Sequence, residues 1–262
     1  MWAIGEISTI EFLLIALSAS INTAICTDSE TPDSKMIETD LLTGSTDSHL
    51  VDLNASSSDH AAMLVHGQIV EPLSELQASA ATAGFDLKLC SGFRSFDRQV
   101  HIWNSKLSGL RPVLDESGEA IDLELLSPWQ QIQALLRWSA LPGTSRHHWG
   151  TDMDIFDANA MPVGYQIQLI PEEVEGQGIF APMHDWLDTE LERFGFYRPY
   201  ATDLGGVAPE RWHISYRPLA DIYAGQLTAE LLRQRLEGTE LLLLDHVVEH
   251  LDEIMQRFVR VA

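Results

Sequence analysis

The sequence predicts a mixed fold, in which helices pack around a few short strands. Apolar residues make up 45% of the 262 residues, which is enough to build a domain-sized core. Segments with helical spacing of apolar side chains occur together with short apolar runs that are typical of strands. The sequence shows no internal repeat with a period of about 20 to 50 residues. We therefore expect a globular protein rather than a disordered or repetitive one.

The elements of the first half follow from capping residues and apolar spacing. A helix is expected from Leu73 to Ala83, because Ser74 and Gln77 have the spacing of a capping box. A strand should follow from Phe85 to Cys90. The pattern from Ser95 to Leu107 predicts a second, amphipathic helix.

The second half of the chain is also predicted to contain both helices and strands. Ser127, followed by proline and with Gln130 three positions later, predicts the start of a third helix. Short apolar runs from Met153 to Phe156 and from Trp212 to Tyr216 predict strands. The apolar spacing near the end of the chain predicts two helices, at Thr228–Leu236 and Glu240–Val261.

Residues 1–60 are expected to be poorly ordered. Residues 1–26 have the apolar middle of a secretory signal, although the first basic residue is Lys35. Residues 27–60 are rich in acidic residues, Ser and Thr, which is typical of a solvated linker. We expect a folded domain over residues 61–217, with a helical extension over 218–262 packing on it. The signal-like segment predicts a location in the periplasm or cell envelope, with the cytoplasm as the alternative.

The charge balance excludes several classes of function. Asp and Glu total 39 against 16 Lys and Arg, which gives a formal net charge of -23 at pH 7. Such a polyanion repels nucleic acid and anionic lipid. No stretch reaches the roughly 18 consecutive apolar residues of a transmembrane helix. The two cysteines, Cys26 and Cys90, are too few for a disulfide framework, and the oligomeric state stays open.

Ligand-type polar residues occur between apolar ones in three segments, Ser91–Gln99, Ser145–Asp154 and Glu210–His213. A catalytic zinc ion takes three protein ligands from His, Asp, Glu or Cys and keeps a fourth position for water. His147, Asp154 and His213 supply such a set. Glu210 is the candidate base for the proton of that water.

Strand periodicity constrains the acidic residues of the second segment. Along a strand that begins at Asp152, Met153 and Ile155 would face the core. Asp152 and Asp154 would then project together on the opposite side, where either carboxylate can reach a metal ion.

The loops that flank the strands carry the other candidates. Glu210 and His213 would point to opposite faces of a straight strand, so the chain must turn between them, and Pro209 is well placed for this. Arg94 follows Gly92 at the end of a predicted strand. From that loop its guanidinium can bind a substrate carboxylate or a developing oxyanion.

Together, the three segments resemble the VanY-type D-alanyl-D-alanine carboxypeptidases, within the zinc peptidases that include lysostaphin-like enzymes and hedgehog domains. The family pattern is an SGxRS-type segment, then SxHxxGxxxD, then ExWH. This chain has all three in that order, within roughly residues 60–217. The resemblance implies an α+β fold, with a small antiparallel sheet carrying a zinc site, helices packed around it and extra C-terminal helices.

The resemblance also implies a role for each matching residue. Zinc would be held by His147, Asp154 and His213, with Glu210 as the catalytic base and Arg94 in contact with substrate. Residues that match positions lining or supporting the substrate cleft are Ser91, Gln99 and Ser145.

The activity that the resemblance implies is zinc-dependent hydrolysis of the terminal D-Ala-D-Ala bond of a peptidoglycan stem peptide. The alternatives are an L,D-carboxypeptidase, a peptidoglycan endopeptidase of the same family, or a metal-binding module without catalysis. The presence of Glu210 argues against the last of these, because a non-catalytic module has no need of the base.

Asp152 departs from the family pattern, which usually has a small residue two positions before the metal-binding aspartate. Its carboxylate would either orient His147 from outside the ligand set or compete with Asp154 for the metal. We favour the orienting role, because ligating histidines are commonly hydrogen-bonded to carboxylates.

Two other patterns receive structural interpretations. His246 and His250 match the HxxEH pattern of another zinc-peptidase class, but a helical wheel turns both towards solvent. That class also needs a glutamate ligand from a distant downstream helix, and only 12 residues follow His250. The aromatic cluster from Phe194 to Tyr200 is typical of core and turn.

Overall fold

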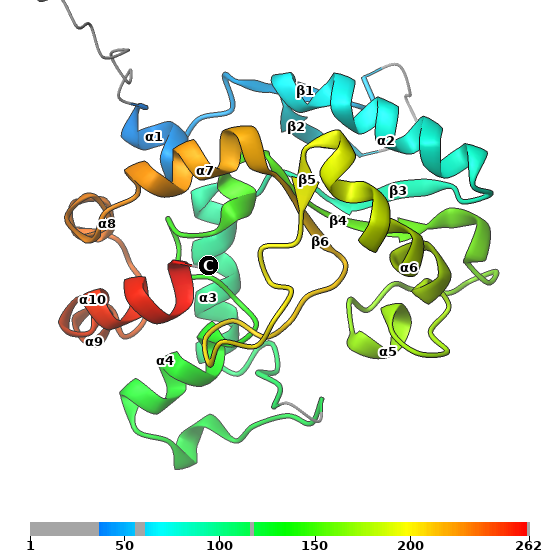
Figure 1. Ribbon diagram of the computed structural model, residues 1–262. Helices are drawn as coiled ribbons and strands as arrows, with labels where there is room; N and C mark the ends of the chain where they lie inside the picture. The colour runs from blue at the N-terminus through cyan, green and yellow to red at the C-terminus, as the bar shows by residue number, and fades with distance from the viewer. Residues whose placement is uncertain (1–36, 56–60, 116–117, 261–262) are drawn as a thin grey trace, which may run out of the picture. The chain divides into compact units, whose positions relative to one another are not determined.

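The computed structural model describes residues 37–55, 61–115 and 118–260 (Figure 1). A four-stranded antiparallel sheet has the order β3-β4-β6-β5. Its strands are β3 (Leu87–Ser91), β4 (Asp152–Asp157), β6 (His213–Tyr216) and β5 (Phe196–Tyr197). A separate antiparallel pair is formed by β1 (Leu50–Asp52) and β2 (Leu64–His66). The sheet therefore joins the three motif segments, which lie far apart in the sequence.

Helices surround the sheet, as the sequence predicts. They are α1 (Thr39–Leu42), α2 (Val70–Thr82), α3 (Phe96–Leu107), α4 (Pro128–Leu136), α5 (Pro171–Val174), α6 (Ala181–Glu190), α7 (Arg217–Gln226), α8 (Ala229–Leu236), α9 (Leu244–Glu249) and α10 (Leu251–Ile254). A π-helical turn, Met255–Val259, follows α10. Among the described residues, no helix has the length and apolar character needed to cross a bilayer. The predicted α+β class is confirmed.

Two hydrophobic clusters hold these elements together. In the first, Met153, Ile155 and Ile214 of the sheet pack with side chains of α2 and α6. In the second, side chains of α3 and α4 pack with the C-terminal helices, which lie beside them in Figure 1. The burial of Met153 and Ile155 confirms the predicted alternation along β4 and leaves its aspartates for the other face.

Several predicted helix starts are confirmed by their caps. The side chain of Ser95 accepts a hydrogen bond from the N–H of Arg98 at the start of α3. Ser127 and Gln130 form the predicted capping box of α4. The side chain of Thr228 caps α8. In each case a polar side chain satisfies a backbone N–H that the helix itself leaves without a partner.

The capping box predicted at Ser74 and Gln77 is wrong. Helix α2 begins earlier, at Val70, directly after a single 3-10 turn. The amide of Gln77 donates instead to the carbonyl oxygen of Leu87 in β3 (3.1 Å). The tertiary contact with the strand therefore decides the position of this side chain.

The single helix predicted over 240–261 is broken, and it begins only at Leu244. Residues before it dock on α3 in a non-helical conformation, because Trp103 Nε1 donates to the carbonyl oxygen of Leu242 (3.0 Å). The N–H of Leu242 in turn donates to Asn104 Oδ1 (2.9 Å). Leu243 then has a positive φ of 61°. Helices α6 and α7 have no counterpart among the elements predicted from the sequence.

The expectation of disorder over residues 1–60 is wrong for residues 37–55, while 1–36 and 56–60 lie outside the described residues. Strand β1 pairs with β2, and the side chain of Leu42 is 1% exposed. The indole of Trp149 donates to the Leu42 carbonyl oxygen (3.0 Å). Composition failed here because this segment has few apolar residues of its own and is stabilised by packing on the rest of the domain.

Candidate active site

Strand β4 and its neighbour β6 bring the two predicted aspartates to one histidine. Asp154 pairs with His213 in the register of the sheet, and Asp152 pairs with Ser215. The carboxylates of both aspartates lie against the His213 imidazole, one on each of its nitrogen atoms. The alternation predicted from the sequence therefore places both acids at the site, where they contact different nitrogen atoms of the same ring.

His147 lies in a 3-10 turn, Arg146–Trp149, just before β4. Gly150 ends this turn with a φ of +69°, a conformation that glycine adopts without strain. The Nδ1 atom of His147 is 2.9 Å from the carbonyl oxygen of Gly92, which can only accept, so Nδ1 carries the proton. The lone pair of Nε2 is thus left facing Asp154 Oδ2, at 3.5 Å.

His213 is fixed in the complementary way. Its Nε2 atom is 3.0 Å from Asp152 Oδ1, a carboxylate acceptor, which leaves the Nδ1 atom for a metal ion. Nδ1 is 3.3 Å from Asp154 Oδ1 and 3.6 Å from Glu210 Oε2. The predicted turn is present, since the N–H of His213 donates to the carbonyl oxygen of Glu210 (3.1 Å).

These three side chains fit a zinc ion. One ligand atom from each of His147, Asp154 and His213 lies within 4.8 Å of the other two, and all three residues are buried. Tetrahedral ligands at about 2.0–2.1 Å from zinc are roughly 3.3 Å apart, close to the spacing between the imidazole nitrogens and Asp154. In the part of the chain that the structure describes, no other three His, Cys, Asp or Glu residues form such a group.

Asp152 orients His213, so the predicted contact with His147 is wrong. The reason is the sheet register, which places Asp152 beside β6, whereas His147 is held by a backbone carbonyl group. Arg146 Nε donates to Asp152 Oδ1 at 2.7 Å, and both side chains are almost fully buried. Burial alone would raise the pKa of Asp152, but the Arg146 charge and the hydrogen bonds outweigh it and keep the pKa below its usual value.

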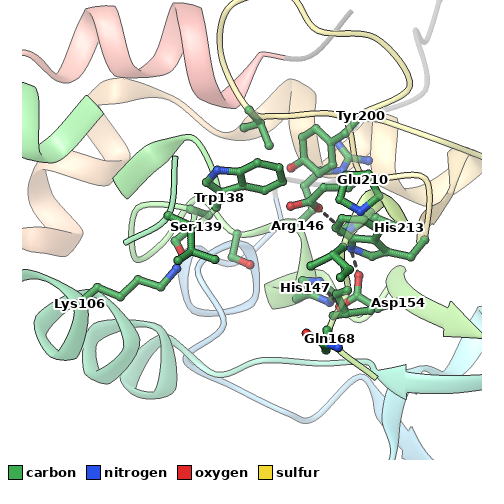
Figure 2. Close-up of a pocket in the computed structure, with 18 of the residues that line it drawn as sticks. Lys106, Trp138, Ser139, Arg146, His147, Asp154, Gln168, Tyr200, Glu210 and His213 are labelled. Atoms are coloured by element: carbon green, nitrogen blue, oxygen red, sulfur yellow. Dashed lines mark hydrogen bonds and ion pairs between the residues drawn. The ribbon is translucent and has the colours of Figure 1, made fainter. Parts of the chain in front are cut away.

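Glu210, whose side chain is 16% exposed, lies beside the ligand set, and Figure 2 shows it next to His213. Burial is the main cause that raises its pKa to about 7, and the nearby Asp154 charge adds to the effect. The aromatic ring of Tyr200 packs edge-on against His213, with ring centroids 5.0 Å apart. Tyr200 therefore belongs to the site, and its interpretation as core and turn was incomplete.

The other predicted substrate residues divide into two groups. Arg94 and Ser145 line the cavity in front of the ligand set. Ser91 and Gln99 are not among its lining residues. Gln99 is fully buried and accepts a hydrogen bond from Arg94 Nη1 (3.1 Å), so it positions the guanidinium. Ser91 ends β3 opposite Asp154 in the sheet.

The cavity has a volume of about 350 Å³. Besides the motif residues, it is lined by side chains that sequence reasoning missed, among them Lys106, Trp138, Ser139 and Gln168. None of these belongs to a motif, and the packing of α3 against the end of α4 brings the first three to the cavity. No local pattern in the sequence signals that contact.

The C-terminal segment supports the loop that carries Tyr200 and Glu210. Phe258 of the π-helical turn lines the cavity. Arg257 Nε donates to the carbonyl oxygen of Gly205 (2.6 Å) in that loop. A Cβ atom on Gly206 would overlap the carbonyl oxygen of Arg257, so the loop packs directly on this backbone. The extension, whose purpose is not visible in the sequence, thus forms part of the site.

The HxxEH residues have structural contacts. The imidazole of His250 stacks on Trp129, with ring centroids 4.0 Å apart. His246 Nδ1 lies 3.6 Å from Glu249 Oε2 in its own helix.

Comparison with known proteins agrees with the geometry. The family described as VanY: D-alanyl-D-alanine carboxypeptidase matches residues 62–219, which is more than half of the chain. The chain belongs to the VanY family. All three motif segments fall inside the matched residues, whereas helices α8 to α10 follow them. Membership in the VanY family makes the chain a peptidase of the carboxypeptidase type.

Individual relatives of this VanY-family chain differ in identity and in the share of the chain that they cover. An uncharacterized protein of Haemophilus influenzae is 48% identical over 103 residues, covering 39% of this chain and 68% of that protein. A D-alanyl-D-alanine carboxypeptidase of Enterococcus faecalis is 27% identical over 147 residues, covering 55% of this chain and 45% of the relative. Among solved structures, VanYB in complex with D-alanine-D-alanine is 23% identical, with a TM-score of 0.46, covering 72% of this chain and 89% of that chain.

Proposed function

We propose that this protein is a zinc-dependent carboxypeptidase that hydrolyses the terminal D-Ala-D-Ala bond of peptidoglycan stem peptides. The observation that carries the proposal is the arrangement of lone pairs. His147 Nε2 and His213 Nδ1 both face the Asp154 carboxylate, and Glu210 lies 3.6 Å from His213 Nδ1 at the edge of a cavity. Such an open set of three ligands with an adjacent carboxylate is typical of catalytic zinc sites.

Each side chain has one task in the proposed reaction. A bound zinc ion supplies Lewis acidity, which polarises the scissile carbonyl group and lowers the pKa of water. Glu210 removes the proton from the attacking water and delivers it to the leaving amine. Arg94, held by Gln99, donates hydrogen bonds to the C-terminal carboxylate or to the oxyanion that forms during attack. Asp152 keeps the His213 ring in the orientation that ligation requires.

The substrate also motivates a proposal on location. We propose that the protein acts in the periplasm or cell envelope, because peptidoglycan peptides are exposed there. Immunoblots of periplasmic and cytoplasmic fractions test this, and recovery in the cytoplasmic fraction alone would contradict it.

Digestion of defined peptides with mass analysis of the products tests the activity. The wild-type protein with zinc should release a single D-alanine from a peptide that ends in D-Ala-D-Ala, and chelation should stop the reaction until zinc is restored. Glu210→Gln should retain zinc while turnover falls by a factor of about 10² to 10⁴. Glu237→Gln, at an exposed position outside the cavity, is the matched control.

The products also separate the alternatives. Release of D-alanine from a peptide with a single terminal D-alanine after an L-centre would identify an L,D-carboxypeptidase. Internal cleavage would identify an endopeptidase. Zinc binding with no cleavage of any of these peptides would identify a metal-binding module and refute the proposed activity.

A further inference from the structure

A second group of hydrogen-bond donors lines the cavity away from the candidate metal ligands. Lys106 comes from the last turn of α3, and Trp138 and Ser139 follow the end of α4. Lys106 Nζ donates to Ser139 Oγ at 2.6 Å. Figure 2 shows Lys106 and Ser139 at the opposite end of the pocket from Asp154, with Trp138 next to them. The role proposed above for the metal end uses none of these three residues.

Of the cations that line the cavity, Arg146 has a carboxylate partner, whereas Arg94 and Lys106 have neutral hydrogen-bond partners. Arg146 forms a buried ion pair with Asp152. Arg94 is held by Gln99. For Lys106, the described residues provide no carboxylate within 4.0 Å of its ammonium group, although the protein is strongly acidic overall. An unpaired ammonium in a cavity attracts an anionic group of a ligand.

Two further observations point to an anion at this position. Burial is the main cause that lowers the pKa of Lys106, the positive charges of Arg111 and Arg94 lower it further, and the Glu210 charge offsets only part of this. An incoming anion would relieve both effects. In addition, Trp138 Nε1 is buried without a hydrogen-bond partner in the described part of the chain. An unsatisfied buried donor is unfavourable, and an acceptor on a ligand in the cavity would satisfy it.

We propose that Lys106, Ser139 and Trp138 form a carboxylate-binding subsite for the part of the peptide on the amino-terminal side of the bond that is cleaved. This proposal rests on the proposed function, because it takes the scissile bond to lie at the candidate metal ligands.

The size of the leaving group indicates which residue of the peptide would supply the anion at Lys106. A carboxypeptidase removes one residue, so the C-terminal carboxylate lies within a residue of the scissile bond. Arg94 is the cation there, since the charge of the candidate ligand Asp154 acts on Arg94 and not on Lys106, whereas the Glu210 charge acts on both. Alanine side chains carry no charge. The anion at Lys106 must therefore come from an earlier residue, and the protein should prefer peptides in which that residue has a side-chain carboxylate.

Two peptides that differ by one carboxylate test this preference. Both end in D-Ala-D-Ala, and the preceding residue is diaminopimelate in one and lysine in the other, which lacks only the side-chain carboxylate. The wild-type protein should have a kcat/KM about ten- to a hundredfold higher for the diaminopimelate peptide, the effect of one charge-assisted contact. In Lys106→Met the ratio of the two values should fall to near one.

Matched variants separate recognition from folding. Lys88→Met removes an exposed lysine on β3 that pairs with Asp86, and it should keep the wild-type ratio. Ser139→Ala and Trp138→Phe each remove one donor with little change in shape, and each should lower the ratio by a smaller factor. Thermal unfolding and zinc content show whether each variant is folded.

The contrary outcomes are distinct. An equal loss on both peptides in Lys106→Met would mean that Lys106 binds a group common to both, such as the C-terminal carboxylate, and would overturn the proposal. An unchanged ratio would overturn it as well. If the wild-type protein cleaves neither peptide, the proposed function fails, but calorimetry on zinc-loaded Glu210→Gln still decides the subsite. If zinc-loaded Glu210→Gln binds the two peptides with equal affinity, the proposed subsite is refuted.

Discussion

The buried pair of Arg146 and Asp152 gives the sharpest test of how the site is supported. Asp152 is fully buried and accepts hydrogen bonds from Arg146, His213, Thr151 and Ser215, at 2.7 to 3.0 Å. Asp152→Asn keeps the shape of the side chain but removes its charge. The Arg146 guanidinium, whose side chain is 4% exposed, is then left buried without a counter-charge.

The magnitude follows from the burial of the pair. Removing one partner of a buried ion pair costs about 3–5 kcal/mol, because the remaining charge stays desolvated. We therefore expect the free energy of unfolding of the metal-free protein to fall by this amount in Asp152→Asn. Zinc affinity should also fall, by a factor of about 10 to 100, because His213 loses a carboxylate acceptor on Nε2. Binding should persist, since Asp154 and both histidines remain.

Urea unfolding of metal-free protein measures the first effect, and competition with a chromophoric chelator measures the second. Asp86→Asn is the control, because the Asp86–Lys88 pair is largely exposed and should contribute less than about 1 kcal/mol. In the double variant Arg146→Met, Asp152→Asn, removal of both charges should recover most of the lost stability.

Two results would refute this reasoning. A change of less than about 1 kcal/mol in Asp152→Asn would mean that the pair contributes no more than a surface ion pair. Complete loss of zinc in Asp152→Asn, with zinc retained in Asp154→Asn, would show that Asp152 and not Asp154 is the metal ligand.

Three further predictions concern substrate, pH and the loop that carries the base. Arg94→Ala should lower kcat/KM about ten- to a hundredfold for a free-acid peptide ending in D-Ala-D-Ala and change little for the amidated peptide, whereas equal wild-type cleavage of acid and amide would exclude recognition of the carboxylate. Burial lowers the pKa of His184 to about 3, so between pH 6.5 and 3 the unfolded chain binds a proton that the folded chain does not. As the pH is lowered through this range, the free energy of unfolding should therefore decrease by up to about 1.4 kcal/mol per pH unit. His184→Gln should make this decrease smaller when urea unfolding is measured at a series of acidic pH values. Gly206→Ala should reduce both activity and melting temperature because its Cβ would overlap the Arg257 carbonyl group, while Gly225→Ala, with open space around it, should do neither.

The sequence alone was enough to select the candidate metal ligands and base, and it determined part of the local structure. The residues His147, Asp154, His213 and Glu210 could be selected because zinc ligands and a base are limited to a few residue types, and their motifs are short and ordered. Strand alternation correctly placed Asp152 and Asp154 on one side of β4. Capping residues also located helix starts correctly, because a cap acts on backbone groups only two or three residues away.

Only the tertiary structure decided which distant groups meet. The register of β4 against β6 gives Asp152 to His213 rather than to His147. The docking of residues 240–242 on α3 delays the last helices, and the packing of α3 near α4 brings Lys106 to Ser139. Residues 37–55 are ordered by contacts with β2 and Trp149 that their own composition does not reveal. These features depend on contacts between residues far apart in the chain, whereas sequence periodicity and capping report only on neighbours.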